Sequence, residues 1–117
     1  MKRILVVDDN TEYLEVLSTV LSSDFDTIKA TGVKEALNIL QAITVDAICS
    51  DQNMRDGTGL ELLEKLRLED VRIPFMLMTG SDDPKIINKA QSYGATFCCK
   101  TEYDLVDRIS EMVNKLN

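Results

Sequence analysis

Histidine does not occur in this sequence of 117 residues. Because no imidazole is present, the chain has no histidine general base, no histidine metal ligand and no histidine that could carry a phosphoryl group. Any acid, base or metal chemistry must therefore come from carboxylates, lysine, hydroxyl groups or cysteine.

Long apolar runs and an excess of positive charge are also missing. No apolar stretch reaches the roughly 20 residues that span a bilayer, and the first residues lack the features of a signal peptide. The sequence has 13 Lys and Arg against 20 Asp and Glu, and its net charge is −7. Such a surface repels polyanions. We therefore expect a cytoplasmic protein that binds neither membranes nor nucleic acid directly.

Cysteine, glycine and proline are sparse. Cys49, Cys98 and Cys99 lie in apolar runs and not at metal-ligand spacing, so we expect reduced residues in or beside the core. A redox role is the weaker alternative. The 5 Gly and 2 Pro form no linker, and no internal repeat occurs. The length is that of one domain, which we expect to cover residues 1–117.

Apolar runs typical of strands alternate with segments of helical periodicity. The run RILVV at 3–7 is apolar at every position after Arg3, which is typical of a strand buried on both faces. Further strands are predicted at 25–30, 46–50, 74–79 and 96–99. The run at 25–30 is the least apolar of them, so we expect it at an edge of the sheet.

Each predicted helix has a start signal, and four of the five have an apolar stripe. The start signals are Asn10, Thr31, a capping box of Thr58 and Glu61, Asp83 before Pro84, and Thr101 with Asp104. The stripes expected to face the core are Leu14, Leu17, Val20 and Leu21; Val33, Ala36, Leu37 and Leu40; Leu60, Leu63 and Leu66; and Leu105, Ile109, Met112 and Val113. Gly94 is predicted to end the fourth helix.

Five strands alternating with five helices predict an α/β fold with a parallel sheet and helices on both faces. We expect the strand order 2-1-3-4-5 of flavodoxin-like, doubly wound proteins. In such folds ligands bind at the carboxyl ends of the strands, where the strand order reverses. The residues at these ends are Asp8 and Asp9, Asp51, Thr79 and Gly80, and Lys100.

The acids at these ends need a cation. In the expected strand order the first and third strands are neighbours, which brings Asp8, Asp9 and Asp51 into one pocket. Two unit charges about 4 Å apart repel by roughly 4 kcal/mol at an effective dielectric constant of about 20, so the pocket requires a counter-ion or raised pKa values. Carboxylate oxygens in a small site suit Mg²⁺.

Lysine and threonine at the same edge predict a further anion. An ammonium and a hydroxyl beside a metal ion are typical equipment for holding phosphoryl oxygens. A carboxylate facing them can act as the nucleophile and form an acyl phosphate. We therefore predict that Asp51 accepts a phosphoryl group, and that Gly57 and Gly59 allow the backbone to pass close by.

Four segments in this order resemble the response-regulator receiver domain of two-component signalling. ILVVDDN is similar to its first strand and acidic pair, and DQNMRDGTGLELL to its phosphoacceptor loop. PFMLMTG is similar to its switch strand, and GATFCCK to the strand that ends in its lysine. The resemblance covers nearly the whole chain and implies Mg²⁺-dependent phosphorylation by a histidine kinase or phosphotransfer protein.

The resemblance also implies roles for individual residues. Asp51 would be the phosphoacceptor and a metal ligand, Asp9 a direct metal ligand, and Asp8 a ligand mainly through water. The backbone carbonyl of Asn53 would complete the protein's share of the metal shell. Thr79 and Lys100 would bind phosphoryl oxygens.

Further positions would control switching and access to the phosphoryl group. Phe97 would occupy the aromatic switch position together with Thr79, and Gly80 would leave room for the phosphodonor. Asn53 and Ser81 stand where the family tunes the lifetime of the acyl phosphate. The face formed by the fourth helix, fifth strand and fifth helix would bind a downstream output domain or protein.

Two residues depart from the pattern of the family. Arg55 stands where a proline often follows the methionine of the acceptor loop. Thr101 stands where a proline, commonly with a cis peptide bond, usually follows the lysine. Because a cis bond before a residue other than proline costs about 3 to 4 kcal/mol, we predict a trans bond between Lys100 and Thr101 and a reshaped loop.

Other interpretations of the same residues remain. Asp8 and Asp9 with Asn10 could be only a solvated loop that caps a helix. The chain could be an interaction module of the same fold that is not phosphorylated, or a small phosphatase with a phosphoaspartyl intermediate. An EF-hand is excluded, because Asp56 and Leu62 stand where that loop needs Gly and Glu.

Overall fold

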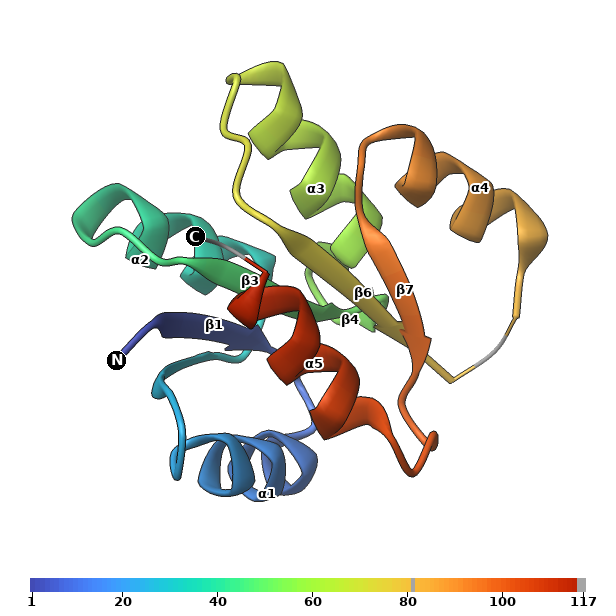
Figure 1. The fold of residues 1–117 in the computed structure, drawn as a ribbon. Helices are drawn as coiled ribbons and strands as arrows, with labels where there is room; N and C mark the ends of the chain where they lie inside the picture. Colours follow the sequence, from blue (N-terminus) through green and yellow to red (C-terminus); the bar gives the residue numbers. More distant parts are fainter. Residues whose placement is uncertain (81, 116–117) are drawn as a thin grey trace.

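The computed structural model describes residues 1–80 and 82–115. Its main sheet has five parallel strands in the spatial order β2-β1-β3-β6-β7 (Figure 1). Counted along the chain, these five strands have the predicted order 2-1-3-4-5. Their bounds are Arg3–Val7 (β1), Asp26–Ala30 (β2), Ala47–Asp51 (β3), Phe75–Thr79 (β6) and Thr96–Cys99 (β7). The predicted fold class is confirmed.

Helices cover both faces of this sheet (Figure 1). The helices α1 (Thr11–Leu21) and α5 (Leu105–Asn114) pack on one face, against a cluster that includes Ile4 and Val6. The helices α2 (Val33–Ala42), α3 (Gly59–Leu68) and α4 (Pro84–Ser92) pack on the other face, where Leu5 and Val7 point. Successive side chains of β1 point to opposite faces of the sheet and therefore belong to two separate cores. This explains why its sequence is apolar at nearly every position.

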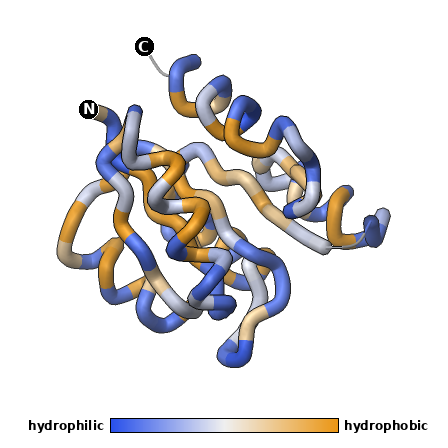
Figure 2. The backbone as a smooth tube through the Cα atoms, turned by 90° about the horizontal axis from the view of Figure 1, so that it is seen from below, coloured by the Kyte–Doolittle hydropathy of each residue, from blue (hydrophilic) through white to orange (hydrophobic). Residues whose placement is uncertain are grey.

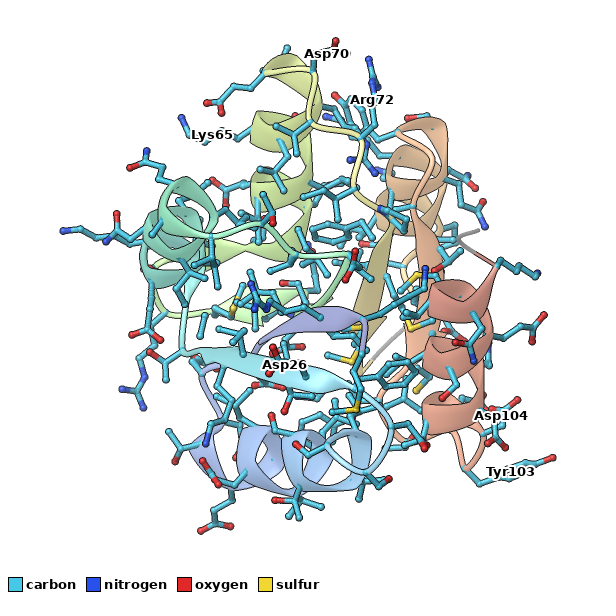
Figure 3. All side chains as sticks on the ribbon, turned by 60° about the vertical axis from the view of Figure 1, so that its left-hand side comes forward. Asp26, Lys65, Asp70, Arg72, Tyr103 and Asp104 are labelled. Atoms are coloured by element: carbon cyan, nitrogen blue, oxygen red, sulfur yellow. The ribbon has the colours of Figure 1, made fainter. Side chains whose placement is uncertain are left out.

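The distribution of hydropathy follows this layering. Segments in the interior of the molecule are mostly hydrophobic, and hydrophilic segments lie at the outer turns and loops (Figure 2). Charged side chains such as Lys65, Asp70 and Arg72 project outward from the rim (Figure 3). None of the helices within residues 1–80 and 82–115 is long and apolar enough to cross a membrane.

Most of the predicted start signals are confirmed. Asn10 accepts a hydrogen bond from the N–H of Tyr13 at 3.1 Å, and Thr58 and Glu61 form both bonds of a capping box. Asp83 caps α4 before Pro84. These caps satisfy N–H groups that a helix leaves without a partner in its first turn.

The cap predicted at Thr31 is wrong. The N-cap position of α2 is Gly32, and the capping carboxylate is supplied by Asp56, whose two oxygens accept from the N–H groups of Val33 at 2.9 Å and Lys34 at 3.0 Å. These bonds lower the pKa of Asp56. A carboxylate from a distant loop therefore takes the place of a local hydroxyl.

One predicted core position also differs. Val20 is 48% exposed, because the buried stripe of α1 is Leu14, Leu17, Ser18 and Leu21, at spacings of three and four. The predicted stripes also include residues that are half-buried and pack against the two cores: Val33, Leu37, Leu40, Leu60 and Met112. In α3 the fully buried residue that the prediction missed is Leu62, beside the predicted Leu63 and Leu66.

The acceptor loop contains a small hairpin that the sequence analysis left as a loop. Its strands are β4 (Asn53–Met54) and β5 (Gly57–Thr58), and they pair antiparallel. Gly57 has a φ of +150°, a conformation that side chains disfavour. The hairpin turns the chain from the end of β3 into α3 and carries Asp56 toward α2.

Candidate functional site

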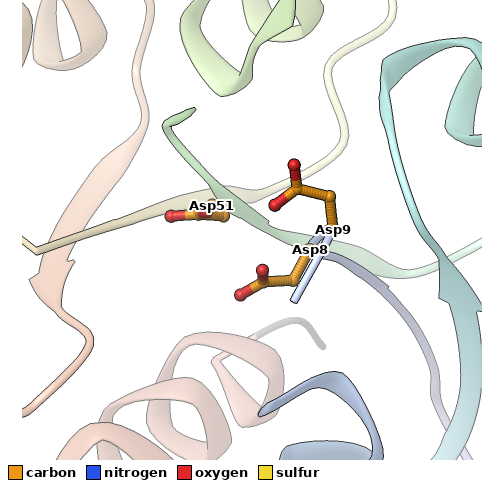
Figure 4. Close-up of side chains that lie close together, drawn as sticks. All are labelled: Asp8, Asp9 and Asp51. Atoms are coloured by element: carbon orange, nitrogen blue, oxygen red, sulfur yellow. The ribbon is translucent and has the colours of Figure 1, made fainter. Parts of the chain in front are cut away.

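The three predicted acids converge at the carboxyl edge of the sheet (Figure 4). Asp8 and Asp9 follow β1, and Asp51 is the last residue of β3. Since β1 and β3 pair in parallel, with Val7 opposite Ser50, their ends lie side by side. One carboxylate oxygen from each acid lies within 4.8 Å of the others. Asp8 is fully buried and Asp51 is 8% exposed.

Lys100 lies in the same site. Its Nζ is 2.7 Å from Oδ2 of Asp8 and 3.7 Å from Oδ2 of Asp51. The peptide bond that joins it to Thr101 is trans, as predicted. The change from proline to Thr101 therefore leaves the ammonium within reach of both acids.

The charges of the site do not balance. Three carboxylates face one ammonium, which leaves a formal surplus of two negative charges when all groups are ionised. Burial, followed by the charge of Asp8, raises the pKa of Asp51, and Lys100 and the N–H of Gln52 only partly oppose this. The surplus and the three oxygen donors fit a hard divalent cation such as Mg²⁺.

Thr79 and Gly80 border the cluster at the end of the neighbouring strand. Thr79 ends β6, is 3% exposed, and accepts at its backbone oxygen from the N–H of Lys100 at 2.8 Å. A Cβ added to Gly80 would meet no atom within 4 Å, so the site is open beside this residue.

Two further predicted site residues, Asn53 and Phe97, lie on other elements. Asn53 is exposed at the start of the hairpin, and Phe97 is half-buried in β7. The backbone oxygen of Phe97 accepts from Nη2 of Arg108 in α5 at 2.8 Å. Ser81 lies outside the described residues.

Close packing beneath Asp51 depends on Gly59. A Cβ there would lie 2.5 Å from the backbone oxygen of Asp51 and 2.6 Å from Cδ1 of Leu77. Such distances are impossible without a shift of the backbone. The prediction that Gly59 permits a close backbone approach is therefore confirmed.

Sequence reasoning missed three residues that shape the site. The N–H of Gln52 donates to Oδ1 of Asp51 at 2.9 Å, and its side chain accepts from the N–H of Leu60 at 3.0 Å. The N–H of Arg55 donates to Oδ2 of Asp9 at 2.9 Å. Tyr13 contacts Lys100. No sequence signal announces these bonds, except that a proline at position 55 would have no N–H to donate.

A doubly wound parallel sheet whose carboxyl edge joins three carboxylates and a lysine defines an α/β protein with a cluster of charged side chains at that edge. Residues 4–110 match the family model of the response regulator receiver domain. The chain belongs to this family, the receiver domains of two-component signalling. The predicted resemblance is confirmed.

Relatives and solved structures agree with this assignment. The two-component response regulator ARR10 of Arabidopsis thaliana is 31% identical over 96 residues, which cover 80% of this chain and 17% of that protein. A CheY-like receiver domain protein of Methanospirillum hungatei is 25% identical, with a TM-score of 0.90 over 98% of this chain and 95% of that one. The response regulator TrrA of Thermotoga maritima, solved in complex with Mg(2+)-BeF, is 26% identical, with a TM-score of 0.84 over 100% of both chains.

The lengths of the relatives differ from that of this chain. The first curated relatives are longer proteins, of which this chain spans 16 to 18%. The region shared with this chain is therefore a small part of each of those proteins.

Proposed function

We propose that this receiver domain accepts a phosphoryl group on Asp51 from a phosphohistidine of a separate kinase or phosphotransfer protein. The observation that carries the proposal is the convergence of the Asp51 carboxylate with Lys100, 3.7 Å away, and with two further acids. The phosphohistidine must lie outside these 117 residues, because they contain no histidine.

The reaction would use residues already in contact. One oxygen of the ionised Asp51 attacks phosphorus, an O–P bond forms, and the P–N bond of the donor breaks, leaving the imidazole with the electron pair. Lys100 and the hydroxyl of Thr79 then bind phosphoryl oxygens, which stabilises the charge that they carry. Gly80 leaves the approach open to the donor.

Asp9, Asp51 and the backbone carbonyl of Asn53 would hold Mg²⁺ directly, and Asp8 would do so mainly through water. When bound, the ion neutralises carboxylate and phosphoryl charge. Three carboxylate oxygens within 4.8 Å of one another support this assignment, as does the Mg(2+)-BeF complex of the similar protein TrrA.

Phosphorylation would add close to two negative charges at Asp51. Thr79 and Lys100 would follow these charges, and Phe97 would change its side-chain rotamer, since it has no hydroxyl with which to form a new hydrogen bond. The face of α4, β7 and α5 would then bind an output domain or protein. The bond from Arg108 to the backbone of Phe97 supports a coupling of β7 to α5.

Incubation with acetyl phosphate and Mg²⁺, followed by intact mass measurement, tests the proposal. The wild type is expected to gain one phosphoryl group, and the gain is expected to disappear with EDTA or in the Asp51→Asn variant. Asp24→Asn, which changes an exposed acid, is the matched control and keeps the gain. A wild type that gains no phosphoryl group would contradict the proposal and favour an interaction module of receiver fold.

A further inference from the structure

Tyr13, in the first turn of α1, contacts Lys100 at two points. Its phenolic O–H donates to the backbone oxygen of Lys100 across 3.3 Å, and the Nζ of Lys100 lies 4.3 Å from the centre of the Tyr13 ring. A single aromatic side chain therefore holds both the backbone and the ammonium of this lysine.

These contacts are part of a closed chain of hydrogen bonds that passes through the acidic pocket and returns to Tyr13. Nζ of Lys100 donates to Oδ2 of Asp8 at 2.7 Å, and Oδ1 of Asp8 accepts from the N–H of Asn10 at 2.9 Å. The side chain of Asn10 in turn accepts from the N–H of Tyr13 at 3.1 Å. The loop after β1 thus fixes the ring, and the ring fixes the lysine.

An aromatic ring suits a lysine that must bind an incoming anion. A flexible lysine stem loses rotamer freedom when it is ordered, so a preformed contact reduces the cost of binding. Asp8 already pairs with the ammonium, and the face of the ring attracts it without adding a further net charge. Burial, and then the charges of Asp8 and Asp51, raise the pKa of Tyr13 to about 12, which keeps the phenol neutral.

The turn after Lys100 increases the need for such a contact. Thr101 is exposed and lacks the ring with which a proline would fix the backbone. The bond from Tyr13 to the carbonyl of Lys100 anchors this turn from the opposite side, across 87 residues of sequence.

We propose that Tyr13 is a positioning residue that holds Lys100 in the orientation that binds the phosphoryl group. This inference rests on the proposed function, in which Lys100 pairs with phosphoryl oxygens. The phenol would fix the backbone of the lysine, and the ring would keep its ammonium oriented beside Asp8 and Asp51.

Binding of Mg²⁺ alone and of Mg²⁺ with beryllofluoride, both measured by calorimetry, tests the proposal. Tyr13→Leu is expected to weaken beryllofluoride binding about three- to tenfold and to change Mg²⁺ affinity by less than about twofold. Tyr13→Phe, which keeps the ring, is expected to lose about twofold. Tyr103→Leu is the control, because Tyr103 is 97% exposed and points away from the body of the protein (Figure 3).

A structural role alone would not reproduce two further results. In a Lys100→Met background, Tyr13→Leu is expected to have no additional effect on beryllofluoride binding. In proton NMR spectra, the ring current of Tyr13 is expected to shift the ε-methylene protons of Lys100 upfield of those of the other lysines, and Tyr13→Leu to remove the shift. Tyr13→Phe retains the shift and serves where Tyr13→Leu does not fold.

Two outcomes would overturn the inference in distinguishable ways. A wild type that binds no beryllofluoride in the presence of Mg²⁺ removes the proposed function and the role of Tyr13 together. A wild type that binds it, with an equal affinity in Tyr13→Leu or with unshifted Lys100 protons, removes only the role of Tyr13.

Discussion

A mostly buried, positively charged side chain lies at each end of the central sheet. The two side chains have different kinds of partner. At the carboxyl end, Lys100 faces three carboxylates. At the amino end, the guanidinium of Arg67 in α3, 9% exposed, donates to three backbone oxygens, those of Tyr93, Val71 and Ile73, at 2.7 to 3.0 Å.

This difference in partners distinguishes a structural brace, Arg67, from a candidate binding site around Lys100. Arg67 joins the end of α4 to the segment that enters β6, and its bonds leave the carbonyls at these chain turns paired. The acids around Lys100 instead keep a surplus of negative charge that the chain does not neutralise. A mostly buried charge therefore indicates a ligand site when the group and its partners together carry a net charge.

Removal of the brace should have the largest effect on stability. Arg67→Met would leave three shielded carbonyls without their donors, and we expect the free energy of unfolding to fall by about 2 to 4 kcal/mol. Urea denaturation measures this loss. Arg72→Met, at an exposed arginine paired with Asp70, should change stability by less than about 0.5 kcal/mol. Equal losses in the two variants would contradict the assignment of Arg67 as a brace.

Removal of surplus charge at the other end should stabilise the protein. Asp51→Asn keeps the acceptor for the N–H of Gln52 and eliminates one carboxylate. At pH 7 without Mg²⁺ we expect the unfolding free energy to rise by about 1 to 2 kcal/mol. The variant that cannot be phosphorylated should thus be the more stable one. A less stable variant under these conditions would show that the acids are not in electrostatic conflict.

The pH dependence of this stabilisation has a definite sign. The pKa of Asp51 is raised in the folded state above its ordinary value of 3.8, so the folded protein holds the proton more tightly than the unfolded chain. The contribution of Asp51 to stability therefore declines as pH rises from 3.8 through the raised pKa. The difference between Asp51→Asn and wild type should grow over this range, and denaturation at several pH values measures it.

Asp56 should show the opposite dependence on pH and a smaller effect. Its pKa is lowered by the N–H groups of Lys34 and Val33, so its contribution is present above the unfolded value of 3.8 and is lost as pH falls through the lowered pKa. Asp56→Ala should cost about 1 kcal/mol at pH 7. Asp24→Ala is the control, and a loss that persists unchanged at acidic pH would exclude capping by the carboxylate.

The sequence was sufficient for those features that depend on local pattern. An unbroken apolar run such as residues 4–7 indicates a central strand, and a capping box needs only Thr58 and Glu61. The convergence of Asp9 and Asp51 follows from strand order, because parallel strands end at one edge. Fold class and site location could therefore be predicted together.

Contacts between distant segments could not be predicted in this way. The cap of α2 comes from Asp56, more than 20 residues along the chain, so the local hydroxyl of Thr31 was a misleading signal. The contact of Tyr13 with Lys100 and the bond from Arg55 to Asp9 depend on how the loops fold over the sheet edge. Val20 was misplaced because an apolar residue beside a stripe looks like part of it.

The most direct test of the account is a titration of the unphosphorylated protein with Mg²⁺. Calorimetry measures the binding, and the unfolding temperature is measured with and without Mg²⁺. We predict that one Mg²⁺ binds, that it raises the unfolding temperature of the wild type, and that Asp9→Asn weakens this binding at least about tenfold. A wild type whose unfolding temperature and heat of mixing do not respond to Mg²⁺ would contradict the claim that three converging acids require a divalent cation.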